Sequence, residues 1–108
     1  MHFHDTEDSQ YHRTLRQAAP EMVEAFGAFD AAVFGTEGAL DARTKELIAI
    51  AVAATTQCPY CMDAHVTAAK KAGATEPEVA EAVMVASALR AGGALTHGWL
   101  ALKQYDQP

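Results

Sequence analysis

The apolar residues of this chain recur at steps of three and four, and this helical period is the feature that most restricts its fold. One stripe follows Pro20 and contains Met22, Val23, Phe26, Phe29 and Val33. No stretch shows the sustained alternation of apolar and polar residues that is typical of a half-buried strand. Alanine occurs 24 times, which also favours helix because its side chain loses no conformational freedom there. The predicted fold class is therefore all-α.

Residues that cap or interrupt helices divide the chain into five or six segments. Pro20 and Pro59 suit the first turn of a helix, and Asp41 suits an N-cap. Thr75 and Glu78 fit a capping box, in which the two side chains satisfy end N–H groups reciprocally. We expect helices over residues 9–18, from 20 to about 35, over 42–55, from about 58 to 73, from 76 to an interruption at Gly92–Gly93, and over about 94–104.

The chain length and charge limit the domain organisation and the class of partner. With 108 residues the chain forms a single domain, 1–108, and we expect residues 1–10 to be a mobile tail. A net charge of −6 argues against a nucleic-acid binder and against binding to an anionic membrane. The start of the chain is polar and acidic, unlike a secretory signal, and no run approaches about 20 continuous apolar residues, so a cytoplasmic location is expected.

Residues 58–65, with the sequence CPYCMDAH, carry the clearest chemical signal. Cys58 and Cys61 are three residues apart, and His65 follows Cys61 by four, so a helix would place all three side chains along one strip. The helix is expected to begin at this motif, where its positive end stabilises a thiolate. A Cys-x-x-Cys pair can also close a disulfide with little backbone movement. This pattern predicts redox chemistry.

Other interpretations of these residues remain open on spacing alone. Two cysteines and a histidine supply three zinc ligands, but no fourth ligand with suitable spacing follows. The cysteines can also be small buried apolar residues. Glu46 opens an apolar helix and is either a structural acid or a partly buried carboxylate that relays protons. Three histidines outside the motif are interpreted as part of the solvated N-terminal tail: His2, His4 and His12. His97 is interpreted as a surface or interface residue.

Three stretches of the sequence resemble the AhpD-like core, the alkylhydroperoxidase branch of the carboxymuconolactone decarboxylase superfamily. They are LDARTKELIAIAVA at 40–53, CPYCMDAH at 58–65 and AAKKAGA at 68–74, and the resemblance covers about residues 20–98. It implies a compact helical fold that forms homo-oligomers, from trimer to hexamer. It also implies that Cys61 attacks the peroxide, that Cys58 is its proton donor and resolving partner, and that Glu46 and His65 form the proton relay. Tyr60 occupies the position where the best-known peroxidase members have histidine, and we include it among the catalytic candidates.

The resemblance therefore implies a thiol-dependent peroxidase with an antioxidant role. Its partners are expected to be a small hydroperoxide and an external thiol or dithiol reductant, with no bound cofactor and no metal. Two alternatives come from other functional classes: a decarboxylase acting on a muconolactone-like acid, and a non-enzymatic redox-sensing or binding module. Decarboxylase members do not depend on a Cys-x-x-Cys pair, so the pair argues against the first. Turnover of hydroperoxide separates the peroxidase from the second.

Overall fold

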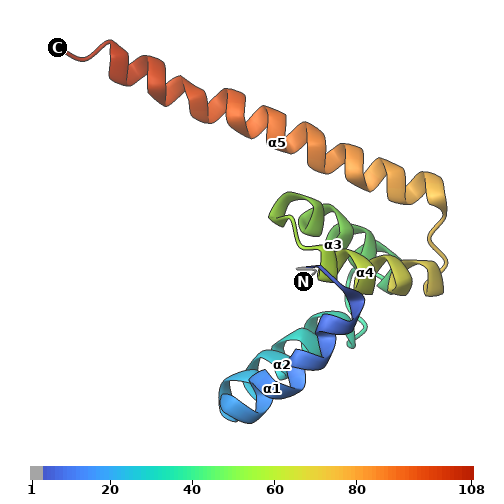
Figure 1. Cartoon of the computed structure of the whole chain (residues 1–108). Helices are drawn as coiled ribbons and strands as arrows, with labels where there is room; N and C mark the ends of the chain where they lie inside the picture. Colours follow the sequence, from blue (N-terminus) through green and yellow to red (C-terminus); the bar gives the residue numbers. More distant parts are fainter. Residues whose placement is uncertain (1–3) are drawn as a thin grey trace.

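The computed structural model describes residues 4–108, and every regular element within them is a helix (Figure 1). The predicted all-α class is therefore confirmed. A short 3-10 helix precedes five α-helices, and the elements in chain order are η1 (Thr6–Gln10), α1 (Tyr11–Ala18), α2 (Pro20–Phe34), α3 (Ala42–Thr56), α4 (Pro59–Lys71) and α5 (Glu76–Tyr105).

The helix starts expected near residues 20, 42, 58 and 76 are confirmed, whereas the first α-helix, expected from residue 9, begins at Tyr11. Pro20 and Pro59 lie in the first turns of α2 and α4. At the start of α3, the Thr44 N–H donates to Asp41 Oδ1 at 2.8 Å. The side chain of Thr44 and this N–H, in that order of importance, lower the pKa of Asp41, since hydrogen bonds to the carboxylate favour its charged form. Thr75 and Glu78 form the reciprocal capping box at the start of α5.

The expected interruption at Gly92–Gly93 is wrong. α5 runs as one helix of 30 residues through both glycines and ends at Tyr105. A glycine inside a helix costs only about 1 kcal/mol relative to alanine. Neither a proline nor a competing cap lies near this pair, so the helix continues at a modest loss of stability.

The segment expected to be a mobile tail contains the helical turn η1. Asp5 caps this turn by accepting the Glu7 N–H, and Asp8 accepts the Asp5 N–H, each at 3.1 Å. The same Asp8 is hydrogen-bonded to Tyr60 of α4, so the turn is attached to the rest of the protein. These bonds explain why residues 4–10 are not the mobile tail that was expected. Residues 1–3, which include His2, lie outside the described part of the chain.

Helix α3 lies between α4 and α5, and α1 pairs with α2 as a helical hairpin on the other side of α3 and α4 (Figure 1). The small core lies where α3, α4 and α5 meet. Its buried residues are Ile50, Ala53, Ala69 and Ala86. Three of these four are alanines, which allow helix backbones to approach closely. The core thus fixes α3 against α4, the two helices that carry the candidate site.

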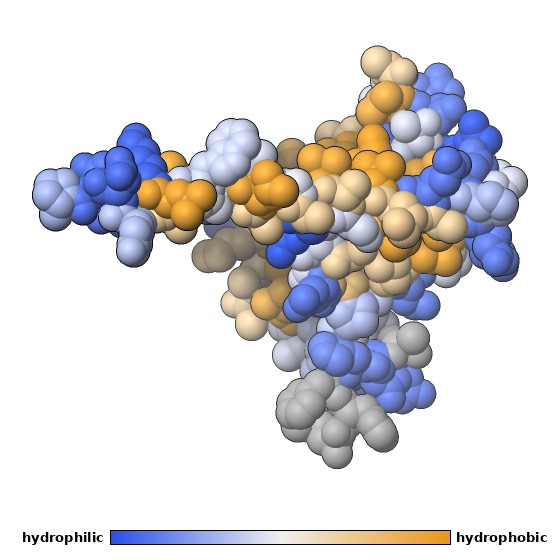
Figure 2. All heavy atoms as spheres, turned by 90° about the horizontal axis from the view of Figure 1, so that it is seen from above, coloured by the Kyte–Doolittle hydropathy of each residue, from blue (hydrophilic) through white to orange (hydrophobic). Residues whose placement is uncertain are grey.

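The folded chain is extended and leaves much apolar surface uncovered. Its radius of gyration is 18.0 Å, whereas a compact domain of this length has about 13 Å. The C-terminal part of α5 projects from the other helices (Figure 1), and Figure 2 shows apolar residues both along this projecting part and on the rest of the molecule beside it. Large exposed side chains on α2 and α5 include Met22, Phe26, Phe29, Leu89, Leu95, Trp99 and Leu102.

By length and composition alone, α5 could cross a membrane. A soluble helix whose apolar face packs against other protein passes the same test. Arg90 lies at the middle of α5, where a charge would be costly in hydrocarbon. This finding therefore does not favour a membrane span over protein packing.

Candidate redox site

The junction between α3 and α4 positions the cysteine motif. Gln57 ends α3 in the left-handed conformation, with φ 56°, and turns the chain sharply. The Cys58 N–H then donates back to the Ala53 carbonyl at 3.2 Å, the arrangement typical of a Schellman cap. Cys58 is also the N-cap of α4, so both neighbouring helices fix its backbone.

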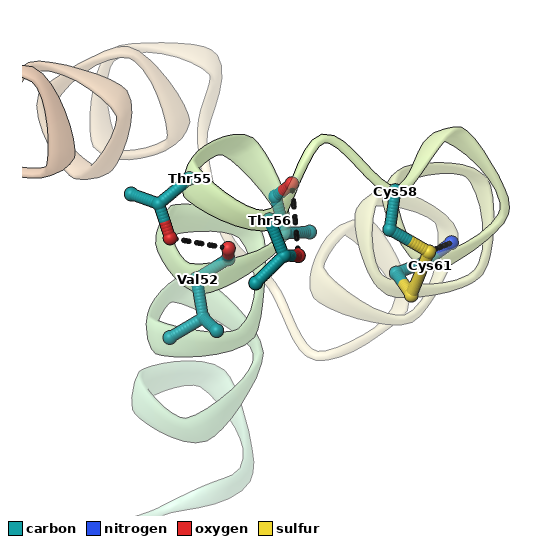
Figure 3. Close-up of a disulfide and its surroundings, with 6 residues drawn as sticks. Val52, Thr55, Thr56, Cys58 and Cys61 are labelled. Atoms are coloured by element: carbon teal, nitrogen blue, oxygen red, sulfur yellow. Dashed lines mark hydrogen bonds between the residues drawn. A yellow bond between two sulfur atoms is a disulfide. The ribbon is translucent and has the colours of Figure 1, made fainter.

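Cys58 and Cys61 form a disulfide across the first turn of α4 (Figure 3). Their Cα atoms are 5.3 Å apart, within the normal range for this bond. The Cys61 N–H donates to Cys58 Sγ at 3.1 Å, so this sulfur takes the place of a polar N-cap side chain. Both cysteines are partly exposed. The pair is therefore accessible and lies at the positive end of a helix, which stabilises a thiolate when the bond is reduced.

A second pair joins α3 to α4. His65 Nδ1 lies 2.6 Å from Glu46 Oε2. The Glu46 side chain is 12% exposed and that of His65 is 25% exposed. When Nδ1–H donates to the carboxylate, a neutral imidazole carries its lone pair on Nε2. In this tautomer, Nε2 is the ring nitrogen that can accept a proton.

Two further residues support this pair: Phe34, the last residue of α2, and Lys45 in α3. The Phe34 ring lies 4.9 Å from that of His65, centroid to centroid. Lys45, next to Glu46, donates its Nζ–H groups to the carbonyls of Val33 at 2.7 Å and Thr36 at 3.0 Å. These contacts hold the end of α2 beside the histidine. No sequence pattern singled out Phe34 or Lys45, because each looks like an ordinary helix residue.

Tyr60 extends to a different part of the molecule. Its hydroxyl donates to Asp8 Oδ2 at 2.7 Å, and its ring lies 5.9 Å from that of His4. The hydrogen bond lowers the pKa of Asp8 and raises the pKa of Tyr60, because it favours the carboxylate together with the neutral phenol. Asp8 was not among the predicted site residues, and no sequence pattern pointed to a contact 52 positions away.

The structure thus brings four of the five predicted site residues together as two pairs, Cys58 with Cys61 and Glu46 with His65, while the Tyr60 side chain bonds Asp8 instead. Among the described contacts, none joins the disulfide to the acid–histidine pair directly. Over residues 4–108, no group of three potential metal ligands lies close enough together to hold an ion. The arrangement offers an accessible disulfide at a helix start and, on the same helix, a histidine oriented by a carboxylate.

Bacterial relatives match most of the chain. A protein of Paracoccus denitrificans, "uncharacterized protein 4 in cox locus", is 46% identical over 84% of this chain and 81% of its own. An uncharacterised protein of Haemophilus influenzae is 52% identical over 85% of this chain and 80% of its own. Both alignments are long enough to include a whole domain of this size.

Two solved structures share the fold. A Methanobacterium thermoautotrophicum protein is 38% identical, with a TM-score of 0.74, over 81% of this chain and 97% of its own. A carboxymuconolactone decarboxylase family protein from Legionella pneumophila is 34% identical, with a TM-score of 0.73, over 91% of this chain and 88% of its own. The carboxymuconolactone decarboxylase family profile matches residues 20–104, the region that contains α2 to α5 except the last residue of α5. The chain therefore belongs to the carboxymuconolactone decarboxylase family, and its helices correspond to the AhpD-like core of that superfamily.

Proposed function

We propose that this protein is a thiol-dependent peroxidase whose redox centre is the Cys58–Cys61 pair. The observation that carries the proposal is the closed disulfide at the start of α4. A structural staple between residues three apart would constrain only one helical turn, whereas a reversible bond at an accessible helix start serves electron transfer. Family membership is consistent with this chemistry, and the Cys-x-x-Cys pair favours it over decarboxylation.

The proposed cycle has three balanced steps. The Cys61 thiolate attacks the terminal oxygen of the hydroperoxide, which yields the sulfenic acid and releases an alcohol after protonation. The Cys58 thiol then attacks the sulfenic sulfur, forms the disulfide and releases water. An external dithiol finally reduces the disulfide through a mixed disulfide and is itself oxidised to a disulfide.

The acid–histidine pair is assigned to proton movement in this cycle. His65 Nε2 accepts a proton when a cysteine ionises and returns it to the leaving oxygen, while Glu46 holds the ring by its Nδ1–H. The distance of 2.6 Å and the low exposure of Glu46 support this role, since a solvated surface acid would not be held so closely.

We also propose that the active form is a homo-oligomer. The protomer buries few side chains, exposes apolar residues along α2 and α5, and is more extended than a compact domain. Surfaces of this kind are usually covered by another protein subunit. Gly92, Gly93 and Gly98 face open space in the protomer, which leaves room for a close approach by a neighbouring helix.

Peroxidase turnover tests the proposed activity. Reduced protein is mixed with cumene hydroperoxide or hydrogen peroxide in the presence of dithiothreitol, and peroxide loss is followed. Cys61→Ser should reduce turnover to the background rate, and Cys58→Ser should leave a sulfenic acid on Cys61 that a dimedone adduct detects by mass spectrometry.

Met62→Leu is the matched control, because it replaces the neighbouring sulfur side chain on the same turn with one of similar volume. It should retain the wild-type rate. Wild-type protein that cycles its disulfide with dithiothreitol but consumes no peroxide would refute the peroxidase assignment. Cys61→Ser protein with wild-type turnover would refute the whole cycle.

A further inference from the structure

Tyr60 belongs to the short turn that the disulfide closes. It lies directly before Cys61 and two residues after Cys58, so its backbone is part of the ring that the two sulfur atoms complete. Its side chain leaves this turn and donates to Asp8 at 2.7 Å, across 52 positions of sequence. The redox turn is therefore held from outside α3 and α4 by a residue of the N-terminal segment.

Asp8 is itself held in place for this contact. The Asp5 N–H donates to the same Oδ2 atom of Asp8 at 3.1 Å, within the capped turn of η1. The Tyr60–Asp8 bond is charge-assisted, since a phenol donates to a carboxylate whose pKa is lowered by the contact. Segment η1 also packs against α4. A fixed acceptor thus meets a side chain of the redox turn at close hydrogen-bonding distance.

We propose that Asp8 is a positioning residue that preorganises the Cys58–Cys61 turn for disulfide formation. This inference rests on the proposed redox role of the pair. Closing the ring requires the backbone of Tyr60 to adopt one conformation, and its loss of freedom opposes the bond. A side chain that is already tied to Asp8 has lost part of that freedom before the sulfur atoms meet. Asp8 therefore raises the effective concentration of one thiol at the other without touching either.

The test measures the thiol–disulfide equilibrium directly in a glutathione buffer. In this reaction the protein disulfide and two glutathione thiols yield the protein dithiol and one glutathione disulfide. Asp8→Ala and Tyr60→Phe should each weaken the protein disulfide about three- to tenfold, the range expected for the loss of one net hydrogen bond. A tenfold change corresponds to about 30 mV in reduction potential. Acid quenching, alkylation and mass spectrometry give the oxidised fraction.

A double-mutant cycle distinguishes the bond from general loosening. The double variant Asp8→Ala/Tyr60→Phe should be no weaker than either single variant, because both remove the same interaction. Glu7→Ala is the matched control, since it removes an exposed carboxylate from the same turn, and it should leave the equilibrium unchanged. Far-UV circular dichroism should show that all variants keep the wild-type helix content.

Three results would overturn the inference: wild-type equilibria in both single variants, additive effects in the double variant, or an equal shift in Glu7→Ala. If Asp8→Ala disrupts folding, Tyr60→Phe and the control still test the bond from its other end. The readout does not require peroxide turnover. If the wild-type protein consumes no peroxide but the Asp8→Ala and Tyr60→Phe variants show the expected weakening of the disulfide, the peroxidase proposal is refuted and the positioning role is supported.

Discussion

The substitution Glu46→Gln should reduce peroxidase turnover far more than it reduces stability. Gln keeps the shape of the side chain and removes its charge. The carboxylate can only accept from His65 Nδ1–H, at the observed distance of 2.6 Å. An amide can instead turn its NH₂ group toward Nδ1, which moves the ring proton to Nε2 and removes the base from the side assigned to proton transfer.

The magnitudes separate the two effects. A hydrogen bond with a charged partner contributes about 1.5–3 kcal/mol, and a neutral one about 0.5–1.5 kcal/mol. Because the Gln variant retains a neutral bond and the ring is one quarter exposed, the free energy of unfolding should fall by only about 1 kcal/mol. Loss of a positioned base costs about 10²- to 10⁴-fold in rate, or about 2.7–5.4 kcal/mol in activation free energy.

Steady-state peroxidase kinetics and urea unfolding of the same preparations provide the comparison. kcat/KM for cumene hydroperoxide should fall at least a hundredfold, with the unfolding midpoint close to that of the wild type. Glu24→Gln, which neutralises an exposed acid beyond the first turn of α2, controls for the change in net charge and should affect neither. A Glu46→Gln enzyme with wild-type kinetics would show that Glu46 is a structural acid, and a large loss of stability with normal kinetics would show the same.

Three further predictions concern the thiols, the assembly and a helix cap. In reduced protein near neutral pH, alkylation read by mass spectrometry should label Cys61 before Cys58, and His65→Ala should slow that labelling. Faster labelling of Cys58 would fit the N–H that its sulfur accepts and would reverse the two roles. Light scattering behind a sizing column should give a mass of several protomers of 11.5 kDa, and Trp99→Glu should shift it toward the protomer; a wild-type protomer mass at micromolar concentration contradicts the assembly. Thr75→Ala removes the hydroxyl that caps α5, so the free energy of unfolding should fall by about 1 kcal/mol, and an unchanged thermal melt would contradict the cap.

Local chemistry made the helix starts predictable from the sequence. Asp41 and Thr75 were expected to cap helices, and each makes its bond to a backbone N–H of the first turn. The pairing of Cys58 with Cys61 could be predicted for the same reason, since a spacing of three residues brings the two side chains together on one helical turn. Each of these interactions joins residues close in the chain.

Features that depend on other parts of the chain could not be predicted in this way. The period of α3 placed Glu46 at the edge of an apolar helix, but its pairing with His65 depends on how α3 packs against α4. The Tyr60–Asp8 bond depends on where η1 folds back. Two adjacent glycines such as Gly92–Gly93 favour a helix interruption locally, but the helical conformation there depends on the helix stability summed over all 30 residues of α5. In each case a distant contact or a sum over many residues outweighs the local signal.

The second half of α5 is a helix that lacks a tertiary support of its own within the protomer. Every residue from 91 to 108 is exposed, and isolated helices of about 12–15 residues are marginal in water. In the proposed oligomer, its helix–coil balance is therefore set by the neighbouring subunit that covers it. Dilution should fray this half from Tyr105 inward, so that the circular dichroism signal falls with concentration while the buried amides around Ile50 keep their protection from hydrogen exchange.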